Sequence, residues 1–346
     1  MAENTRIEWT DATVNFWWGC TKVGPGCDHC YAETHDRRFG PSHWGRGVAR
    51  RKIKGAVALM HRLDNGYAEW AADYEVAAGN ARAFGLPAPT FGPRQRVFVS
   101  SMADLFDLEV PLDWFREGWG TIEACDRIEI QIVTKRIGAV EKRLAAIGRD
   151  RWPGHAGLII TVTDQAEADR DVPRLLALKA RLGIPWVGLS CEPLLGPVDL
   201  TRVQWGGDLI YGSTDALRGI DTCLEFPGEP LPARGKIDWI IAGGESGPGA
   251  RPMHPDWARS LRDQCKAAGV PFFFKQFGEW MPARPGDECE AGVWMHRNGD
   301  TFRPVEGERF TPAPFAEHIV RVGKKAAGRL LDGVTHDGTP AAGRPS

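Results

Sequence analysis

Three cysteines near the amino end are the residues whose type and spacing point most directly to chemistry. Cys20, Cys27 and Cys30 are separated by six and then by two residues. A Cys-x-x-Cys step lets two thiolates reach one metal centre, and the Gly-Pro-Gly segment 24–26 lets the chain bend so that Cys20 can return to it. Three thiolates hold a 4Fe–4S cubane with one iron left without a protein ligand, so the motif predicts an iron–sulfur site with an open position.

Structural zinc is the alternative for the same motif. Zinc takes four ligands, and His29, His35 or His43 could supply the fourth. Neither a second Cys-x-x-Cys nor a Cys/His pair at finger spacing follows, which favours the cluster. The other five cysteines are scattered and are expected to be buried small hydrophobes or bystanders: Cys125, Cys191, Cys223, Cys265 and Cys289.

The elements that must position these residues follow from hydrophobic periodicity. After residue 95, short β-branched and aromatic runs alternate with amphipathic stretches, the pattern of βα units around a parallel sheet. Strands are predicted at residues 97–100, 129–134, 158–162, 186–190, 239–242 and 271–275, and helices at 112–125, 139–147, 167–182 and 255–268. The expected fold is α/β, an incomplete parallel (β/α) barrel of about six strands, with a further helix at 31–39 after the cysteines.

The chain organisation adds insertions and an extension to this barrel. The barrel domain is expected to span residues 1–280, with insertions near 40–95 and 201–236. Residues 281–346 are expected to form a C-terminal extension. It contains a two-residue hairpin signal at Asn298-Gly299, a closing helix near Lys324 and a disordered end from Gly338 onwards.

Composition sets limits on the partners. The net charge is −2 and the pI about 6.5, so no global positive field indicates nucleic-acid binding. A local basic run at residues 46–54, after Arg37 and Arg38, is either a solvated loop or a phosphate-contacting one. The 14 tryptophans indicate either ordinary core packing or pockets for ring-shaped ligands. The chain shows no signal peptide and no run of 18 apolar residues, so we expect a cytoplasmic protein without a membrane partner.

The opening segment 7–15, followed by the cysteine motif, resembles a functionally uncharacterised family of phage and prophage proteins. That family is described by its radical-SAM-like three-cysteine motif, where SAM is S-adenosylmethionine. The resemblance runs through nearly the whole chain and includes segments 190–197, 243–247, 274–278 and 322–333. The family description carries no reaction.

Segments 97–106, 131–136 and 161–164 are similar, in order and placement, to strand-end motifs of spore photoproduct lyase-like radical SAM proteins. The resemblance implies a radical SAM-like barrel, a 4Fe–4S cluster and SAM as cofactors, and reductive cleavage of SAM to a 5′-deoxyadenosyl radical. A nucleotide or nucleic acid is the first substrate expected, with an electron-donor protein and a partner protein encoded nearby. The sequence departs from the family pattern in its longer first cysteine loop and in His29, which stands where an aromatic ring is usual.

Polar residues that follow the predicted strands are the candidate site, because carboxyl ends of parallel strands meet at one rim. The expected SAM-binding residues follow the first two strands and the last cysteine: Ser100, Ser101, Asp104, Thr134, Lys135 and Tyr31. For Asp104 and Lys135, a capping or a solvated role is the alternative. The expected catalytic residues follow later strands: Glu192, Glu245 and Lys275. Arg251, His254 and Gln276 are expected to help line a polar cavity with them.

A second function from another class remains open. The chain could be a zinc- or cluster-stabilised binding module without chemistry of its own, acting with a partner protein. Zinc is colourless because its d shell is full, whereas a cluster absorbs visible light, so an optical spectrum separates the two hypotheses.

Overall fold

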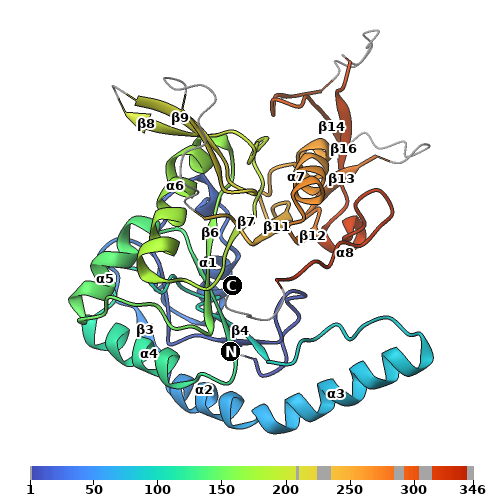
Figure 1. The fold of residues 1–346 in the computed structure, drawn as a ribbon. Coiled ribbons are helices and arrows are strands. Elements are labelled where there is room, and N and C mark those ends of the chain that lie inside the picture. Colours follow the sequence, from blue (N-terminus) through green and yellow to red (C-terminus); the bar gives the residue numbers. More distant parts are fainter. Residues whose placement is uncertain (1, 208–209, 224–234, 284–291, 304–313, 341–346) are drawn as a thin grey trace.

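A curled sheet of seven parallel strands forms the centre of the protein, in a computed structural model that describes residues 2–207, 210–223, 235–283, 292–303 and 314–340. The strand order is β1-β4-β5-β6-β7-β11-β12. The strands are β1 (Ala12–Val14), β4 (Arg96–Val99), β5 (Glu129–Thr134), β6 (Ala156–Thr161), β7 (Val187–Cys191), β11 (Trp239–Gly243) and β12 (Phe272–Gln276). The sheet curls into an open half-barrel (Figure 1), which confirms the predicted α/β class.

The seventh strand is the one that the sequence did not predict. β1 has only three residues, and it pairs with β4 from Ala12↔Val97 to Val14↔Val99. So short a segment carries too little periodicity to stand out in the sequence. Its pairing places the segment that leads to the cysteines at one edge of the half-barrel.

Helices cover the convex side of the sheet. Alternate strand residues point to opposite faces, so each strand contributes one set of side chains to the helix-covered side and another set to the concave side. The connecting helices are α4 (Leu112–Ala124), α5 (Val140–Ala146), α6 (Gln165–Leu182) and α7 (Pro255–Ala268). On β5, Ile130 and Ile132 belong to the large core that these helices share. A second cluster fills the concave side: Trp9, Phe98, Ile159, Trp186, Trp239, Ile241 and Phe273. The floor of the half-barrel is therefore aromatic.

The segment between β1 and β4 carries the cysteine loop and several helices. α1 (Tyr31–Asp36) is shorter than the predicted 31–39 helix, because the chain tightens into a 3₁₀ turn at Arg37–Phe39. α2 (Ala56–Asn65) lies against the body of the protein, whereas α3 (Tyr67–Phe84) extends away from it at the bottom of Figure 1. Ala78 is the one α3 residue that is buried.

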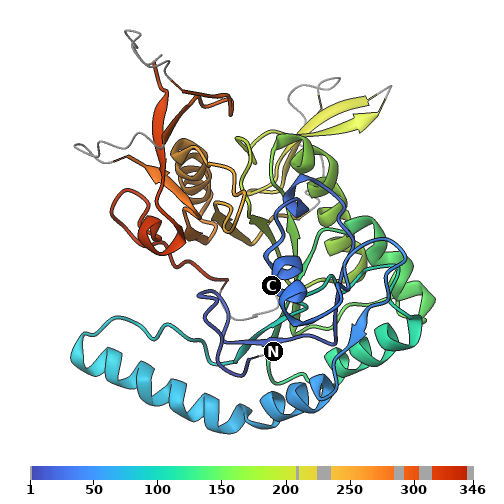
Figure 2. The ribbon, with the colours of Figure 1, turned by 180° about the vertical axis from the view of Figure 1, so that it is seen from behind.

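Two small antiparallel sheets flank the half-barrel, as Figures 1 and 2 show from opposite sides. One is formed by β8 (Val203–Gly207), β9 (Ile210–Asp215) and β10 (Ile220–Cys223). The other is formed by β13 (Trp280–Pro282), β14 (Gly292–Met295), β15 (Thr301–Phe302) and β16 (Glu317–Arg321). Two-stranded pairing of β2 (Trp17–Trp18) with β3 (Arg51–Lys52) completes the strand inventory of the described residues.

The C-terminal predictions need three corrections. The hairpin at Gly299 exists, but Met295 pairs with Thr301, so the turn is longer than two residues. The closing helix α8 (Lys324–Ala327) is a single turn. Gly338 is ordered rather than loose, because its N–H donates to the Phe272 carbonyl at 3.0 Å and its carbonyl accepts from the Trp239 indole at 2.7 Å. The predicted disorder of residues 341–346 lies outside the described residues. Among the described helices, none is both long and apolar enough to cross a membrane.

Candidate functional site

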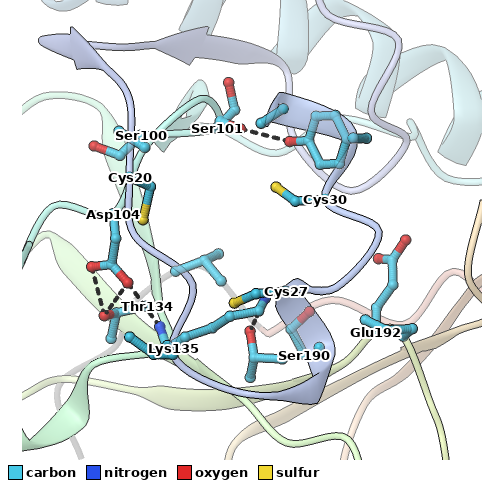
Figure 3. A pocket seen from close by; sticks show the side chains of 18 of the residues that line it. Cys20, Cys27, Cys30, Ser100, Ser101, Asp104, Thr134, Lys135, Ser190 and Glu192 are labelled. Atoms are coloured by element: carbon cyan, nitrogen blue, oxygen red, sulfur yellow. Dashed lines mark hydrogen bonds between the residues drawn. The ribbon is translucent and has the colours of Figure 1, made fainter. Parts of the chain in front are cut away.

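A cavity opens at the carboxyl ends of the parallel strands, and all three cysteines of the motif line it. Figure 3 shows Cys20, Cys27 and Cys30 on different sides of this space, with Asp104, Lys135 and Glu192 among the residues around it. The volume is about 190 Å³. Since one water molecule takes up roughly 30 Å³ of liquid, the cavity can hold a small organic ligand.

Two glycines let the cysteine loop approach neighbouring segments closely. Cys27 ends a 3₁₀ turn at Pro25–Cys27, and a Cβ atom on Gly26 would lie 2.8 Å from Cγ2 of Thr163 at the end of β6. Gly19 has φ +107°, and a Cβ there would lie 2.3 Å from the His43 carbonyl oxygen. Both positions exclude larger residues, which explains why the loop on either side of Cys20 is glycine-rich.

The Cys20 thiol lies beside a guanidinium group. Nη2 of Arg136 is 3.5 Å from Sγ of Cys20 and also donates to the Thr21 carbonyl at 2.6 Å. Burial raises the pKa of Cys20 to about 12, and Arg136 opposes that rise. A nearby cation favours a thiolate over a thiol, so Arg136 suits a metal-binding role for Cys20.

The three thiols are free, with Cys27 buried and the other two half-buried. Among the residues that the structure describes, no three Cys, His, Asp or Glu side chains are grouped closely enough to hold a metal ion. The three histidines considered as a fourth zinc ligand each have a contact within the protein. Nδ1 of His43 contacts Asp36 at 2.9 Å, the His35 ring packs on Phe39, and His29 binds Glu245.

Asp104 is the centre of a buried hydrogen-bond group at the ends of β4 and β5. Its carboxylate oxygens lie 2.8 and 3.0 Å from Oγ1 of Thr134, and they accept from the backbone N–H groups of Lys135 and Phe106. Burial raises the pKa of this carboxyl, and Arg136, the nearest cation, opposes the rise. Asp104 therefore fixes the rim where β5 ends, and it lines the cavity while doing so.

Lys135 reaches into the cavity from the same rim. Its Nζ donates to Oγ1 of Thr161 at 3.0 Å, and its Cε lies 3.5 Å from the position of a Cβ on Gly26. Among the described residues, no carboxylate forms an ion pair with this ammonium group. A half-buried cation with one neutral partner suits a carboxylate or phosphate of a ligand.

Lys275 and Glu192 form an ion pair across the far side of the cavity. Nζ of Lys275 lies 2.7 and 3.0 Å from the two carboxylate oxygens of Glu192, and Nε2 of Gln276 is 3.5 Å from one of them. Both charged side chains are less than one-fifth exposed. Lys275 and Glu192 therefore constrain each other until a ligand competes for one of them.

Glu245 lines the cavity, but its carboxylate is bound to Arg251 and to His29 of the cysteine loop. It accepts from the backbone and side chain of Arg251 at 2.6 to 2.9 Å and lies 3.0 Å from Nδ1 of His29. Arg251 in turn donates to Asp28 and to the Pro25 carbonyl. Burial raises the pKa of Glu245, but these hydrogen bonds outweigh it and hold the pKa below its usual range. Glu245 is thus ionised at neutral pH and committed to the loop.

Tyr31 and the two serines connect the loop to the end of β4. The Tyr31 hydroxyl donates to the Ser101 carbonyl at 2.7 Å, and the Ser101 hydroxyl accepts from Nδ2 of Asn15 at 2.9 Å. Ser100 has φ +70°, a conformation that costs energy for a residue other than glycine. Such strain at a cavity wall is typical of a functional position.

Three residues that were predicted to line the cavity do not line it: Arg251, His254 and Gln276. His254 is fully buried and caps α7, where it accepts from the Asp256 N–H at 3.1 Å. The sequence had placed it by its distance from a strand, but a histidine before a proline-started helix serves equally well as a cap.

Sequence reasoning missed Arg136 and the loop-holding role of His29. Arg136 ends segment 131–136, one of the strand-end motifs, yet nothing in the sequence shows that this arginine will turn towards Cys20. For His29, the signal was its departure from the family pattern, because a histidine ring has nitrogens that can bind a carboxylate.

The basic run at 46–54 is structured rather than a free loop. The Arg50 side chain is fully buried, pairs with Asp107 at 2.8 Å and donates to three backbone carbonyls. Arg51 and Lys52 form β3, and Arg51 lies over the Trp18 ring. Arg50 therefore stabilises the loop and is not available to a phosphate, whereas Arg46, Arg51 and Lys54 remain exposed.

Fold and site together define a parallel α/β half-barrel protein with a three-cysteine loop at its carboxyl-end rim. The chain belongs to the family described as protein of unknown function DUF5131, whose family model matches residues 4–340. No curated protein and no solved structure matches the chain. Family membership brings no activity with it, so the function is argued from the cavity.

Proposed function

We propose that the protein is a radical SAM-like iron–sulfur enzyme that acts on a nucleotide or nucleic acid. One observation carries the proposal: three free cysteines from one loop line the same cavity as the polar residues at the ends of β4, β5, β7 and β12. The relation to phage proteins and to spore photoproduct lyase-like enzymes is part of this proposal.

The chemistry and number of the donors, three free thiols, match a cluster with one open iron. Cys20, Cys27 and Cys30 would hold it, and Arg136 would offset part of the negative charge of the thiolates. Nδ1 of His29, the histidine beside Cys30 in the loop, is bound to Glu245. A cluster held there would supply the one electron needed for reductive cleavage of SAM, the chemistry that removes a hydrogen atom from a substrate.

The protein's own residues would orient the ligands. Lys135 would bind the SAM carboxylate, and Asp104 with Thr134 would keep the rim in place around it. Ser100, Ser101 and Tyr31 line the adjoining wall. Lys275 and Glu192 are the residues we propose to contact the substrate. An electron-donor protein and a partner protein complete the proposal.

Anaerobic reconstitution with iron and sulfide tests the proposal. We expect a broad absorption near roughly 400 nm from sulfur-to-iron charge transfer. With SAM and a strong reductant, we expect slow formation of 5′-deoxyadenosine even without substrate. A sample with confirmed cluster content that binds no SAM and forms no 5′-deoxyadenosine would instead favour a binding module that acts with a partner protein. A colourless, zinc-loaded sample would favour the same alternative.

A further inference from the structure

Two buried polar groups on the cavity wall have no hydrogen-bond partner among the described residues. They are the indole Nε1 of Trp9 and the hydroxyl of Ser100. Trp9 is 5% exposed and Ser100 3% exposed. Buried donors in native proteins are nearly always paired, so two unpaired donors in one cavity call for an explanation.

The wall around these groups is apolar and contains two aromatic rings. The Trp9 ring packs on Phe98 with ring centroids 4.9 Å apart, and Val133 from the neighbouring strand lines the cavity beside them. Phe98 and Ser100 are two residues apart at the end of β4. The cavity thus has an aromatic floor, and Trp9 and Ser100 are among the residues that line it.

A third unpaired group lies beside Phe98 in the sheet, although it does not line the cavity. Gln131 is the cross-strand partner of Phe98 and is fully buried, and neither its amide nitrogen nor its amide oxygen has a partner. Water could satisfy any one of these groups. A cavity of about 190 Å³ with an aromatic floor suits a larger occupant that is itself planar and polar at its edge.

We propose that this floor binds a nucleobase, stacked against Trp9 and Phe98. The Trp9 N–H donates to a ring nitrogen or carbonyl oxygen of the base. The inference deepens the proposed function, on which it rests for its biological meaning. The base has two possible sources, the adenine of SAM and the base of a separate nucleotide substrate, and the same chemistry recognises both.

The test observes the indole N–H itself. Full-length protein labelled with ¹⁵N-tryptophan is titrated with adenosine, thymidine, cytidine and guanosine, with SAM, and with ribose 5-phosphate as a ligand without a base. The Trp9 signal is assigned by its loss in Trp9→Phe, which keeps an aromatic ring and removes the N–H. Trp70→Phe is the matched control, because the Trp70 indole donates to the Gly92 carbonyl at 2.9 Å on the extended helix α3.

We expect a base-containing ligand to shift the Trp9 signal while the Trp70 signal and the ribose 5-phosphate titration stay unchanged. Trp9→Phe should weaken that ligand about tenfold, the usual effect of losing one hydrogen bond, and Trp70→Phe should not. A shift with SAM alone assigns the site to the adenine of SAM. A shift with nucleosides after saturation with SAM assigns it to a substrate base.

If no base-containing ligand shifts the Trp9 signal at millimolar concentration, the site holds water and the inference is wrong. This result is independent of the cluster. Base binding by a protein that assembles no cluster would reject the proposed enzyme function and keep the site. Cluster assembly and 5′-deoxyadenosine formation without any Trp9 shift would support the proposed enzyme function and reject the nucleobase site.

Discussion

Nδ1 of His29 lies 3.0 Å from Oε2 of Glu245, although the two residues are 216 positions apart in the chain. The contact joins the cysteine loop, near the first strand, to the segment after β11, near the other edge of the sheet. Arg251 strengthens it by binding Glu245 and the loop residue Asp28 together. The position of the three thiols is therefore set by the far side of the half-barrel.

Removing the charge of Glu245 should loosen the cysteine loop without removing any of the three cysteines from the cavity. We expect Glu245→Gln to weaken its hydrogen bonds to Arg251 and His29, since charge-assisted bonds are about twice as strong as neutral ones. In metal-free protein, Cys27 and Cys30 should then react several-fold faster with a thiol reagent, as followed by mass spectrometry of each cysteine.

Asp332→Asn is the matched control for this variant. Asp332 also accepts from two arginines, Arg259 and Arg262, but it does not line the cavity. Equal cysteine reactivity in the parent protein and in Glu245→Gln would show that the contact does not hold the loop.

Cluster content should depend on three cysteines and not on three others. Replacing Cys20, Cys27 or Cys30 by Ala should abolish the visible absorption after reconstitution. Cys125, Cys191 and Cys265 are fully buried and lie outside the cavity, so their Ala variants should keep it. The measurement is iron and sulfide per chain together with the optical spectrum. Retention of a full cluster in any variant of the first group would refute the three-thiolate site.

The ion pair between Lys275 and Glu192 should be visible as a coupling energy. Lys275→Ala leaves a half-buried carboxylate unpaired and is expected to lower the free energy of unfolding by about 1–3 kcal/mol. The double variant Lys275→Ala with Glu192→Gln should recover much of that loss, because the uncompensated charge is gone. Urea denaturation of both single variants and the double variant measures the coupling. Additive losses would show that the two side chains do not depend on each other.

Lys275→Ala also separates substrate contact from cofactor chemistry. We expect it to keep the reconstituted absorption and the slow formation of 5′-deoxyadenosine, because the cysteines are unchanged. Loss of both in a folded variant would place Lys275 with the cofactor instead.

Glu129 gives a pH dependence that is independent of the site. Burial of this residue on β5 raises its pKa from 4.5 to about 7, against the effect of Arg96. The folded state binds the proton more tightly than the unfolded state, so stability from this group is full below pH 4.5 and is lost as the pH rises to about 7. Glu129→Gln, which stays neutral, should therefore gain about 2 kcal/mol relative to the parent between pH 5 and pH 8. An equal difference in urea denaturation at both pH values would show that Glu129 is not held neutral.

The sequence predicted the parallel α/β architecture because that information is local. Buried strands such as Ala156–Thr161 are apolar on both faces over most of their length, and helices such as Pro255–Ala268 carry a periodic apolar face and their own start signals. The placement of Asp104, Thr134, Glu192, Glu245 and Lys275 around one cavity follows from the same logic, since parallel strands bring their carboxyl ends to one rim. The three-cysteine spacing is likewise visible in the chain itself.

What tertiary structure decided is where each rim side chain turns and what it binds. Arg136 faces Cys20, Glu245 holds His29, and Arg50 is buried against Asp107, and each of these contacts joins segments that are distant in sequence. The unpaired Trp9 indole is of the same kind, because Trp9 reaches the cavity only when the sheet curls and brings Phe98 beneath it. Hydrophobic patterning determines which face of an element is buried, whereas hydrogen bonds and ion pairs depend on angstrom-scale distances that exist only after the elements have packed.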